Sequence, residues 1–254
     1  MEFNAIYIMW LREMKRFFRA KSRIIGNLSM PFIWLVIMGI GLSSSFSIPG
    51  VKFDYLAFIA PGVIGMTLLF SSIFSGISVI WEKQFGFLKE ILVAPVSRTS
   101  IVLGKIFGSA TISFINGVLI MIIAILIGSI SIASLSVFSI LLAIIFMILI
   151  CLAFVSVGIA IASRLNNMEG FQMIMSFLVM PTFFLSGAFI PLQNAPLWMG
   201  TIAMFDPLLY GVDGLRGVFL GVSQFPIAID LGVLAGFCVA MILLSSYLFR
   251  RMGE

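Results

Sequence analysis

Charged residues are scarce in this sequence. They make up 10% of the 254 residues, whereas hydrophobic residues make up 61% and the mean hydropathy is +1.22. A soluble globular domain usually carries about 25% charged residues, because its surface must be hydrated. The composition therefore excludes an ordinary soluble protein and predicts a chain that is embedded in a membrane.

Histidine is absent, and cysteine occurs only at Cys151 and Cys238, each within an apolar run. Without histidine, the chain lacks the usual imidazole base and the commonest metal ligand. Two cysteines in apolar segments are typical of buried small hydrophobic residues, and they provide no disulfide framework and no redox motif. We therefore expect no metal site in this chain.

Nucleotide-binding and hydrolase motifs are absent as well. The nearest fragment of a phosphate-binding loop is Gly104-Lys105, but Ile106 follows where Ser or Thr would be needed. There is no H-E-x-x-H zinc motif and no G-x-S-x-G nucleophile motif. The sequence predicts that the chain binds no nucleotide by that route, holds no catalytic residues and is not an enzyme by itself.

Long apolar runs, in contrast, are plentiful. A membrane-spanning helix needs about 20 mostly apolar residues. Six runs reach this length: Ile24–Phe46, Tyr55–Ile80, Ile106–Ile130, Leu135–Ala162, Phe171–Ile190 and Ile229–Phe249. The sequence predicts an all-α membrane protein with one transmembrane domain over residues 1–254, five spans within 24–190 and a sixth at 229–249.

The basic residues are distributed unevenly over the two sides of these spans. Six spans place both termini on one side, and that side receives 13 of the 15 basic residues, leaving Lys52 and Arg216 on the other. Lysine and arginine are enriched in cytoplasmic segments. We expect a multi-pass protein of the cell membrane with both termini in the cytoplasm. The excess of basic over acidic residues is then explained by the orientation of the chain in the membrane. We therefore expect no nucleic-acid partner.

Residues 1–23 form an amphipathic segment. Apolar residues recur at three- and four-residue spacing, which predicts one helical face: Phe3, Ile6, Tyr7, Trp10, Met14, Phe17 and Phe18. Basic residues are interleaved with them: Arg12, Lys15, Arg16, Arg19 and Arg23. This pattern predicts a helix in the cytoplasmic interface whose basic side chains face lipid headgroups. A plain positive anchor for the first span is a compatible alternative.

Residues 81–105 carry charges of both signs between two apolar runs. Gly86 interrupts the helix that leaves the second span, Pro95 ends the next turn, and Ser97 is placed to cap the third span. Between them lies a short apolar face with Lys89 and Glu90 opposite: Phe87, Leu88, Ile91 and Leu92. The sequence predicts a short amphipathic helix in the cytoplasm, and an ordinary interfacial loop is the alternative.

The outer segment, residues 191–228, is too apolar for a solvated loop and too interrupted by proline for a span. Asp206-Pro207 predicts a helix N-cap followed by proline at the first helical position. Asp213 and Arg216 are three residues apart and can pair on one helix face. We expect two short helices that dip back into the outer leaflet.

Three classes of membrane protein fit six spans. A secondary transporter or channel would be expected to carry ionisable residues within its spans, and the only acidic residue in any of the six is Asp230, at the very start of the last. A membrane enzyme acting on lipid needs a catalytic constellation, which the absence of histidine disfavours. The third class is the membrane subunit of a pump that is driven by another protein.

Two motifs support this third class. The stretch WEKQFGFLKEILVAPVSRTSIVLGK is similar to a motif of the type-2 ABC exporter permeases, with matches at Glu82, Gly86, Glu90, Pro95, Arg98, Gly104 and Lys105. In DPLLYGVDGLRG, a second family spacing is matched by Pro207, Leu208, Tyr210 and Arg216. Over essentially its whole length, the chain resembles the permease subunit of type-2 ABC exporters of the daunorubicin-resistance and nodulation-factor kinds.

The resemblance implies a permease that dimerises, most simply with a second copy of itself. It also implies two copies of a separate cytoplasmic ABC ATPase, which would bind the ATP and Mg²⁺, and an exported amphipathic drug, lipid or glycan. Residues 81–105 would be the coupling segment that docks on the ATPase, through Glu82, Lys83, Gly86, Phe87, Leu88, Lys89, Glu90, Ile91, Pro95, Arg98 and Lys105. An outer gate would be formed by Asp206, Pro207, Tyr210, Asp213 and Arg216.

Overall fold

The computed structural model describes residues 2–41, 54–87, 91, 95–130, 136–189 and 195–252, without the side chains of residues 21–24. All the regular structure in these ranges is helical, so the predicted all-α class is confirmed. The elements are α1 (Glu2–Arg19), α2 (Lys21–Ile33), η1 (Trp34–Ile40), α4 (Tyr55–Phe74), α5 (Ile77–Gln84), α7 (Arg98–Leu126), α8 (Val137–Arg164), α9 (Met168–Leu185), α10 (Leu197–Ala203), α11 (Pro207–Leu220) and α12 (Ile227–Arg250).

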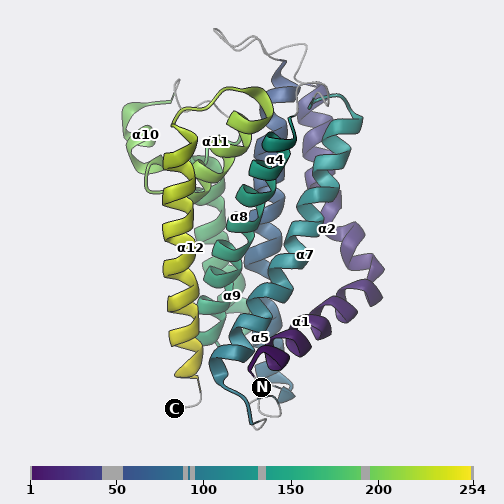
Figure 1. Cartoon of the computed structure of the whole chain (residues 1–254), viewed down its shortest axis with the longest axis vertical. Helices are drawn as coiled ribbons and strands as arrows, with labels where there is room; N and C mark the ends of the chain where they lie inside the picture. The colour runs from purple at the N-terminus through teal and green to yellow at the C-terminus, as the bar shows by residue number, and fades with distance from the viewer. Residues whose placement is uncertain are drawn as a thin grey trace.

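The long helices run side by side along the long axis of the molecule, and α1 lies obliquely across the lower end (Figure 1). Both chain termini lie at that lower end, whereas α10 and α11 lie at the upper end (Figure 1). This arrangement agrees with the predicted placement of both termini on one side of the membrane and of the broken segment on the other.

Five helical stretches are long and apolar enough to cross a membrane: Tyr55–Gln84, Arg98–Leu126, Val137–Arg164, Met168–Leu185 and Ile227–Arg250. They correspond to the second to sixth predicted spans. The first predicted span, Ile24–Phe46, coincides with an apolar helical stretch at Ile25–Ile40. The rest of that prediction lies outside the described residues.

Helix α8 is the centre of the bundle and packs against α4, α5, α7, α11 and α12. Glycine permits a close contact of α8 with the break between α4 and α5. A Cβ atom added to Gly158 would lie 2.4 Å from the carbonyl oxygen of Ile73, and one added to Gly76 would lie 2.4 Å from that of Gly158. Small residues let helix backbones approach closely where lipid provides no hydrophobic force between helices.

The third predicted span begins earlier than the apolar run suggested. Helix α7 starts at Arg98, where the side chain of Ser97 accepts a hydrogen bond from the Ser100 amide at 3.1 Å. The predicted N-cap is therefore confirmed. The first two turns of α7 therefore lie before the predicted apolar run. A helix that begins at a capping residue continues until a residue breaks it.

The predicted apolar face of residues 1–23 is only partly buried. Met14 and Phe17 are buried, but Phe3 and Tyr7 are 87% and 58% exposed. The face of α1 that packs on α7 is instead a stripe with four-residue spacing: Ala5, Met9, Glu13 and Phe17. The exposed side chains of Phe3 and Tyr7 are compatible with the predicted position of this helix in the membrane interface, which stays a prediction. The contact of α1 with α7 was not predicted, because hydrophobic spacing does not distinguish a lipid-facing side from a protein-facing one.

Close packing at Gly158 gives a stability prediction. Replacement of Gly158 by alanine should destabilise the protein by about 1–3 kcal/mol, because the new methyl group would overlap the α4 backbone. The matched change Gly232→Ala in α12, where nothing lies within 4 Å, should be neutral or stabilise the protein by up to about 1 kcal/mol through helix propensity. Thermal unfolding of the purified protein in one detergent measures both. Equal melting temperatures for the two variants would contradict the close contact.

Candidate functional site

Five charged side chains from three helices meet at the lower end of the bundle. We call this group the charge cluster: Arg12, Glu13, Arg16, Glu82 and Lys105. One carboxylate oxygen of Glu82 accepts a hydrogen bond from Arg12, and the other accepts one from Lys105. Arg16 Nη1 lies 3.9 Å from both Glu13 and Glu82. The cluster therefore joins α1, α5 and α7.

The charged groups of Glu82 and Lys105 need these ion pairs because they are buried. Glu82 is 5% exposed and Lys105 is 1% exposed, and an isolated charge at such a position costs several kcal/mol. Burial also disfavours the charged form of Glu13. The positive charges of Lys105, Arg16 and Arg12 together outweigh that effect and hold the pKa of Glu13 below its ordinary value. The cluster thus favours the ionised form of Glu13 and holds α1 against α5 and α7.

Two glycines of α7 let α1 approach closely enough for these pairs to form. A Cβ atom on Gly104 would lie 2.6 Å from the Cβ of Met9, and one on Gly108 would lie 2.9 Å from the Cβ of Glu13. Between these contacts, Trp10 Nε1 donates to the hydroxyl of Thr111 at 3.1 Å. Gly104 and Gly108 form a small-xxx-small pattern on the α7 face that receives α1.

The first residues of the coupling segment are fixed to the end of α8. Lys83 Nζ donates to the carbonyl oxygens of Ser163 at 2.8 Å and Leu165 at 3.0 Å. The side chain of Gln84 donates to the carbonyl of Asn166 at 3.2 Å. A lysine at these carbonyls satisfies acceptors that the helix end leaves free.

The later part of the coupling segment is fixed at two other places. Arg98 Nη1 donates to the carbonyl oxygens of Arg250 at 2.6 Å and Met252 at 3.1 Å, at the end of α12. The hydroxyls of Ser100 and Ser97 donate to the carboxylate of Glu2 on α1, and they hold the pKa of Glu2 below its ordinary value. Both ends of the coupling segment are therefore held by side chains from the bundle.

These contacts revise the sequence prediction for several docking residues. Glu82 and Lys105 have almost no surface to offer a partner, so in this structure they position the segment and do not face an ATPase. The charged groups of Lys83 and Arg98 also bind carbonyls of their own chain. Gly86 has φ +79°, a conformation that favours glycine and turns the chain out of α5. Leu88, Lys89 and Glu90 lie outside the described residues.

Aromatic side chains dominate the exposed part of this end. Trp81, Phe85 and Phe87 are 50%, 64% and 57% exposed, and the rings of Trp81 and Phe85 lie 5.6 Å apart. They border a groove of about 390 Å³, which is also lined by Arg16, Ile77, Ser78 and Glu82. Exposed aromatic residues beside a groove are typical of a surface that binds another protein.

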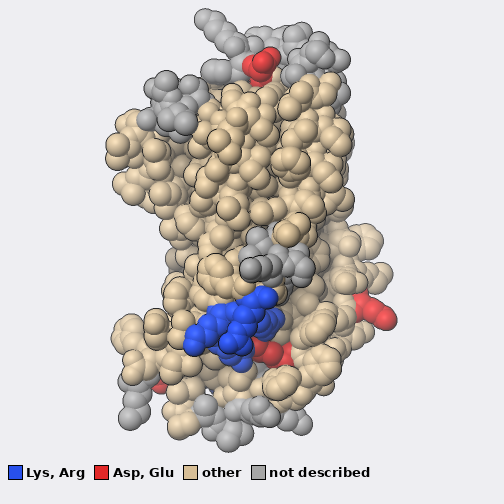
Figure 2. Space-filling model, turned by 90° about the vertical axis from the view of Figure 1, so that its right-hand side faces the viewer, with Lys and Arg blue, Asp and Glu red and all other residues tan. Residues whose placement is uncertain are grey.

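Basic side chains, blue in Figure 2, gather in one patch over the lower part of this face. No lysine or arginine of the described residues is visible above that patch. Helix α1 lies on the side of the molecule that this view presents (Figure 1). Its four basic residues at this end are Arg12, Lys15, Arg16 and Arg19. Arg12 and Arg16 belong to the charge cluster, whereas Lys15 and Arg19 are exposed. Arg16 is exposed as well, and contact of these basic side chains with lipid headgroups stays a prediction.

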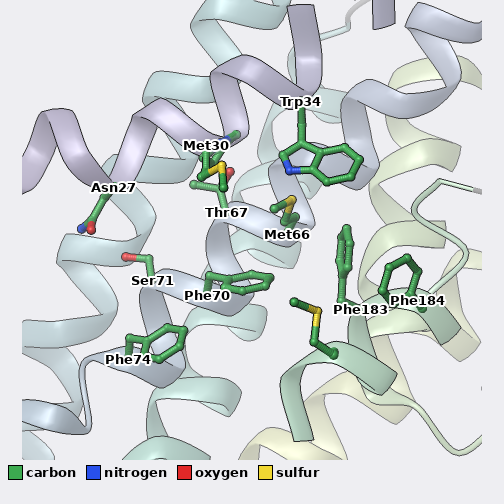
Figure 3. A pocket seen from close by; sticks show the side chains of 12 residues that line it. Asn27, Met30, Trp34, Met66, Thr67, Phe70, Ser71, Phe74, Phe183 and Phe184 are labelled. Carbon is green, nitrogen blue, oxygen red and sulfur yellow. The ribbon is translucent and has the colours of Figure 1, made fainter. Parts of the chain in front are cut away.

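An apolar pocket of about 380 Å³ lies between α2, η1, α4 and α9 (Figure 3). Its lining is rich in methionine and aromatic residues: Asn27, Met30, Pro31, Trp34, Met66, Thr67, Phe70, Ser71, Phe74, Met180, Phe183 and Phe184. Asn27 and Ser71 lie at one side of the pocket, and the rings of Trp34, Phe183 and Phe184 lie at the other (Figure 3). The pocket therefore has an apolar interior with a polar edge.

The outer residues make contacts with backbone groups. The carboxylate of Asp206 accepts from the Leu208 amide at 2.9 Å, which confirms the predicted cap before Pro207. The hydroxyl of Tyr210 donates to the carbonyl of Met204 at 2.9 Å. These two bonds hold the start of α11 to the turn that follows α10.

The predicted pairing of Asp213 with Arg216 is wrong. Asp213 accepts from the amides of Gln224 and Phe225, whereas Arg216 donates to the carbonyl of Gly187 at 2.9 Å. No ion pair within 4.0 Å joins the two side chains, both of which the structure describes. The guanidinium of Arg216 lies 4.0 Å from the ring centroid of Phe58, so Arg216 holds α11 to α4 and to the end of α9.

Sequence reasoning missed two features of these sites. Glu13 was not singled out, although it is an acidic residue among basic ones and shares the four-residue spacing of Ala5 and Met9. Asp230 was taken as the start of a span, yet it is fully buried and neither carboxylate oxygen has a hydrogen-bond partner among the described residues. Only the packing of α12 against the bundle reveals this burial.

The fold and its sites define a multi-pass membrane protein without a nucleotide-binding motif of its own. Residues 4–220 match the ABC-2 type transporter family, and the chain belongs to that family. It is 28% identical over 248 residues to nodulation protein J of Rhizobium leguminosarum bv. viciae, covering 96% of this chain and 91% of that protein. It is 26% identical over 256 residues to the inner membrane transport permease YadH of Escherichia coli K12, covering 97% and 95%. The putative transport permease ycf38 of Cyanophora paradoxa is 28% identical over 203 residues, covering 79% and 69%.

The family assignment confirms the predicted resemblance and makes the chain a transport permease subunit, which is not itself catalytic. Permeases of this family work with a partner ATP-binding subunit.

The buried position of Glu82 gives a second prediction. Glu82→Leu should destabilise the protein by about 3 kcal/mol, because it leaves Lys105 buried without its principal partner. Adding Lys105→Met to that variant should recover most of the loss. Arg16→Gln should change stability by less than about 1 kcal/mol, because that side chain is 45% exposed. Thermal unfolding of the single and double variants measures the coupling, and strictly additive effects of Glu82 and Lys105 would contradict it.

Proposed function

We propose that this chain is the membrane subunit of an ATP-driven exporter and that residues 81–105 couple it to a separate cytoplasmic ATPase. One observation carries the proposal: this segment is fixed to the bundle on both sides and itself presents exposed aromatic residues. A force applied to the segment would reach α1 and α7 through Glu82, the end of α8 through Lys83, and the end of α12 through Arg98.

The proposed roles of the permease and of the ATPase follow from the motifs of this sequence. ATP and Mg²⁺ would bind to the partner ATPase, because this sequence has no phosphate-binding loop. We propose two ATPase copies and two permease copies, most simply a homodimer. The orientation rule places the lower end in the cytoplasm and the protein in the cell membrane, with α10 and α11 at the outer surface.

The apolar pocket between α4 and α9 is the proposed site for the transported molecule. A lining of methionine and phenylalanine side chains adapts to different apolar groups, because these residues fill space without fixed polar contacts. Asn27, Thr67 and Ser71 provide hydrogen-bonding groups at its edge. These features favour an amphipathic drug, lipid or lipid-linked glycan, and the outer gate residues around α11 would lie beyond the pocket on the way out.

Transport without ATP is the second candidate, and Asp230 is the observation that favours it. A buried carboxylate without a hydrogen-bond partner among the described residues is typical of proton- or ion-driven transporters. This candidate requires transport by the permease alone that follows a proton or ion gradient. Transport that needs the ATPase and ATP would exclude it.

Docking through the coupling segment predicts an effect of Phe87. Phe87→Ala should weaken association with the ATPase by about tenfold or more, because a central aromatic contact typically contributes about 2 kcal/mol. Phe3→Ala is the matched control, since Phe3 is an exposed phenylalanine on α1, outside the segment. A pull-down of the ATPase and substrate-stimulated ATP hydrolysis measure the effect. Full association and full stimulation of the Phe87 variant would contradict docking here.

Topology is tested separately. In a background without Cys151 and Cys238, a cysteine at Arg19 should react with a membrane-impermeant reagent only after the membrane is opened. A cysteine at Gln224 should react from outside intact cells, because it follows α11 at the opposite end of the bundle. Both wild-type side chains are exposed. Labelling of both positions from outside would reject the proposed orientation.

A further inference from the structure

A hollow of about 800 Å³ lies at the lower end of the bundle, between the start of α7 and the end of α12. It is lined by Ser97, Arg98, Thr99, Tyr247, Arg250 and Arg251. None of these residues belongs to the charge cluster or lines the groove beside Phe87. The hollow shares Arg98 with the coupling segment, but the family assignment and the proposed coupling do not account for the three arginines gathered in it.

The positive charge in this hollow is not neutralised by the described part of the chain. Arg98, Arg250 and Arg251 form no ion pair within 4.0 Å with any described carboxylate. Glu2 lies close to the start of α7, but its carboxylate accepts hydrogen bonds from Ser97 and Ser100. Three guanidinium groups around one hollow favour a ligand with negative charge and several acceptor oxygens.

Two of the arginines are held in place before any ligand arrives. Arg98 Nη1 donates to the carbonyls of Arg250 and Met252, which leaves its other N–H groups available. The guanidinium of Arg251 lies 4.6 Å from the ring centroid of Tyr247. Side chains that are already ordered lose less conformational entropy when they bind an anion.

An apolar stripe leads away from the hollow along α12. Val239, Leu243 and Tyr247 are four residues apart on one helix face, and they are 57%, 65% and 49% exposed. Only 17% of the apolar window of this helix is buried inside the molecule, so most of its surface faces outward. Tyr247 belongs to both the stripe and the hollow. A hydrocarbon chain along the stripe would therefore place a polar headgroup at the arginines.

We propose that the hollow binds the anionic headgroup of a phospholipid in the adjacent membrane leaflet, with an acyl chain along Val239 and Leu243. A phosphate oxygen would accept from the free N–H groups of Arg98 and from Arg250 or Arg251. Basic pockets between transmembrane helices at the cytoplasmic end suit such headgroups. The apolar stripe favours a lipid over free phosphate or an acidic protein segment, since neither of these would use it.

The test compares phosphatidylglycerol with phosphatidylcholine of the same acyl chains, by native mass spectrometry of the full chain. The wild type should retain phosphatidylglycerol in preference to phosphatidylcholine. In R250Q/R251Q, retention of phosphatidylglycerol should weaken by about tenfold, the scale expected when two basic contacts to a headgroup are lost. The variant R164Q removes a positive charge from an exposed position at the end of α8, outside the hollow, and should retain the lipid like the wild type.

Several results would overturn the proposal. Equal loss of lipid from R250Q/R251Q and R164Q would mean that general surface charge retains it. Equal retention of the two lipids by the wild type would exclude a headgroup site. Complete displacement by millimolar inorganic phosphate would indicate a free-anion site, and displacement by the purified ATPase would indicate a protein interface. Because the readout is lipid binding by the permease alone, failure of the proposed export function would leave this result unaffected.

Discussion

The ion pairs of the buried Glu82 carboxylate are the interaction on which the lower end of this protein depends. Helices in a membrane gain little from burying apolar surface against each other, because lipid tails are as apolar as leucine. A buried charge restricts the arrangement more strongly, since few positions of α1 and α7 bring Arg12 and Lys105 to the same carboxylate. We infer that the pair Glu82–Lys105 sets the angle at which α1 crosses the bundle, while the glycines of α7 set how close it lies.

A consequence of this arrangement is stiffness around the coupling segment. Glu82 and Lys83 are neighbours in the sequence but point to different partners, one to α1 and α7 and the other to the carbonyls at the end of α8. Arg98 provides a third connection, at the end of α12. Any movement of the segment must therefore displace several helices together or break hydrogen bonds to charged groups, which contribute about 1.5–3 kcal/mol each.

The sequence predicts features that depend on neighbouring residues, but it does not predict contacts between residues that are far apart in the chain. The spans follow from the length of apolar residues that a membrane requires, and the caps at Ser97 and Asp206 follow from the chemistry of helix ends, so both could be predicted. The partners of Glu82 could not, because they come from helices far apart in the sequence. The contact of α1 with α7 could not be predicted either, because the buried stripe of α1 includes a charged residue, Glu13, while Phe3 is exposed. Hydrophobicity identifies that a helix lies at a membrane, but the contacts between helices decide which face is covered.

The two ends of the bundle differ in the kind of contact that holds them. At the lower end, charged side chains bind one another across helices. At the upper end, Tyr210 and Asp213 bind main-chain groups within a few residues of α11, so α11 and its flanking turns are held as one unit. Arg216 instead reaches outside that unit, to Gly187 at the end of α9 and to Phe58 on α4. An outer gate built from α11 would therefore move as a rigid body, and the contacts of Arg216 are the ones that such a movement must break.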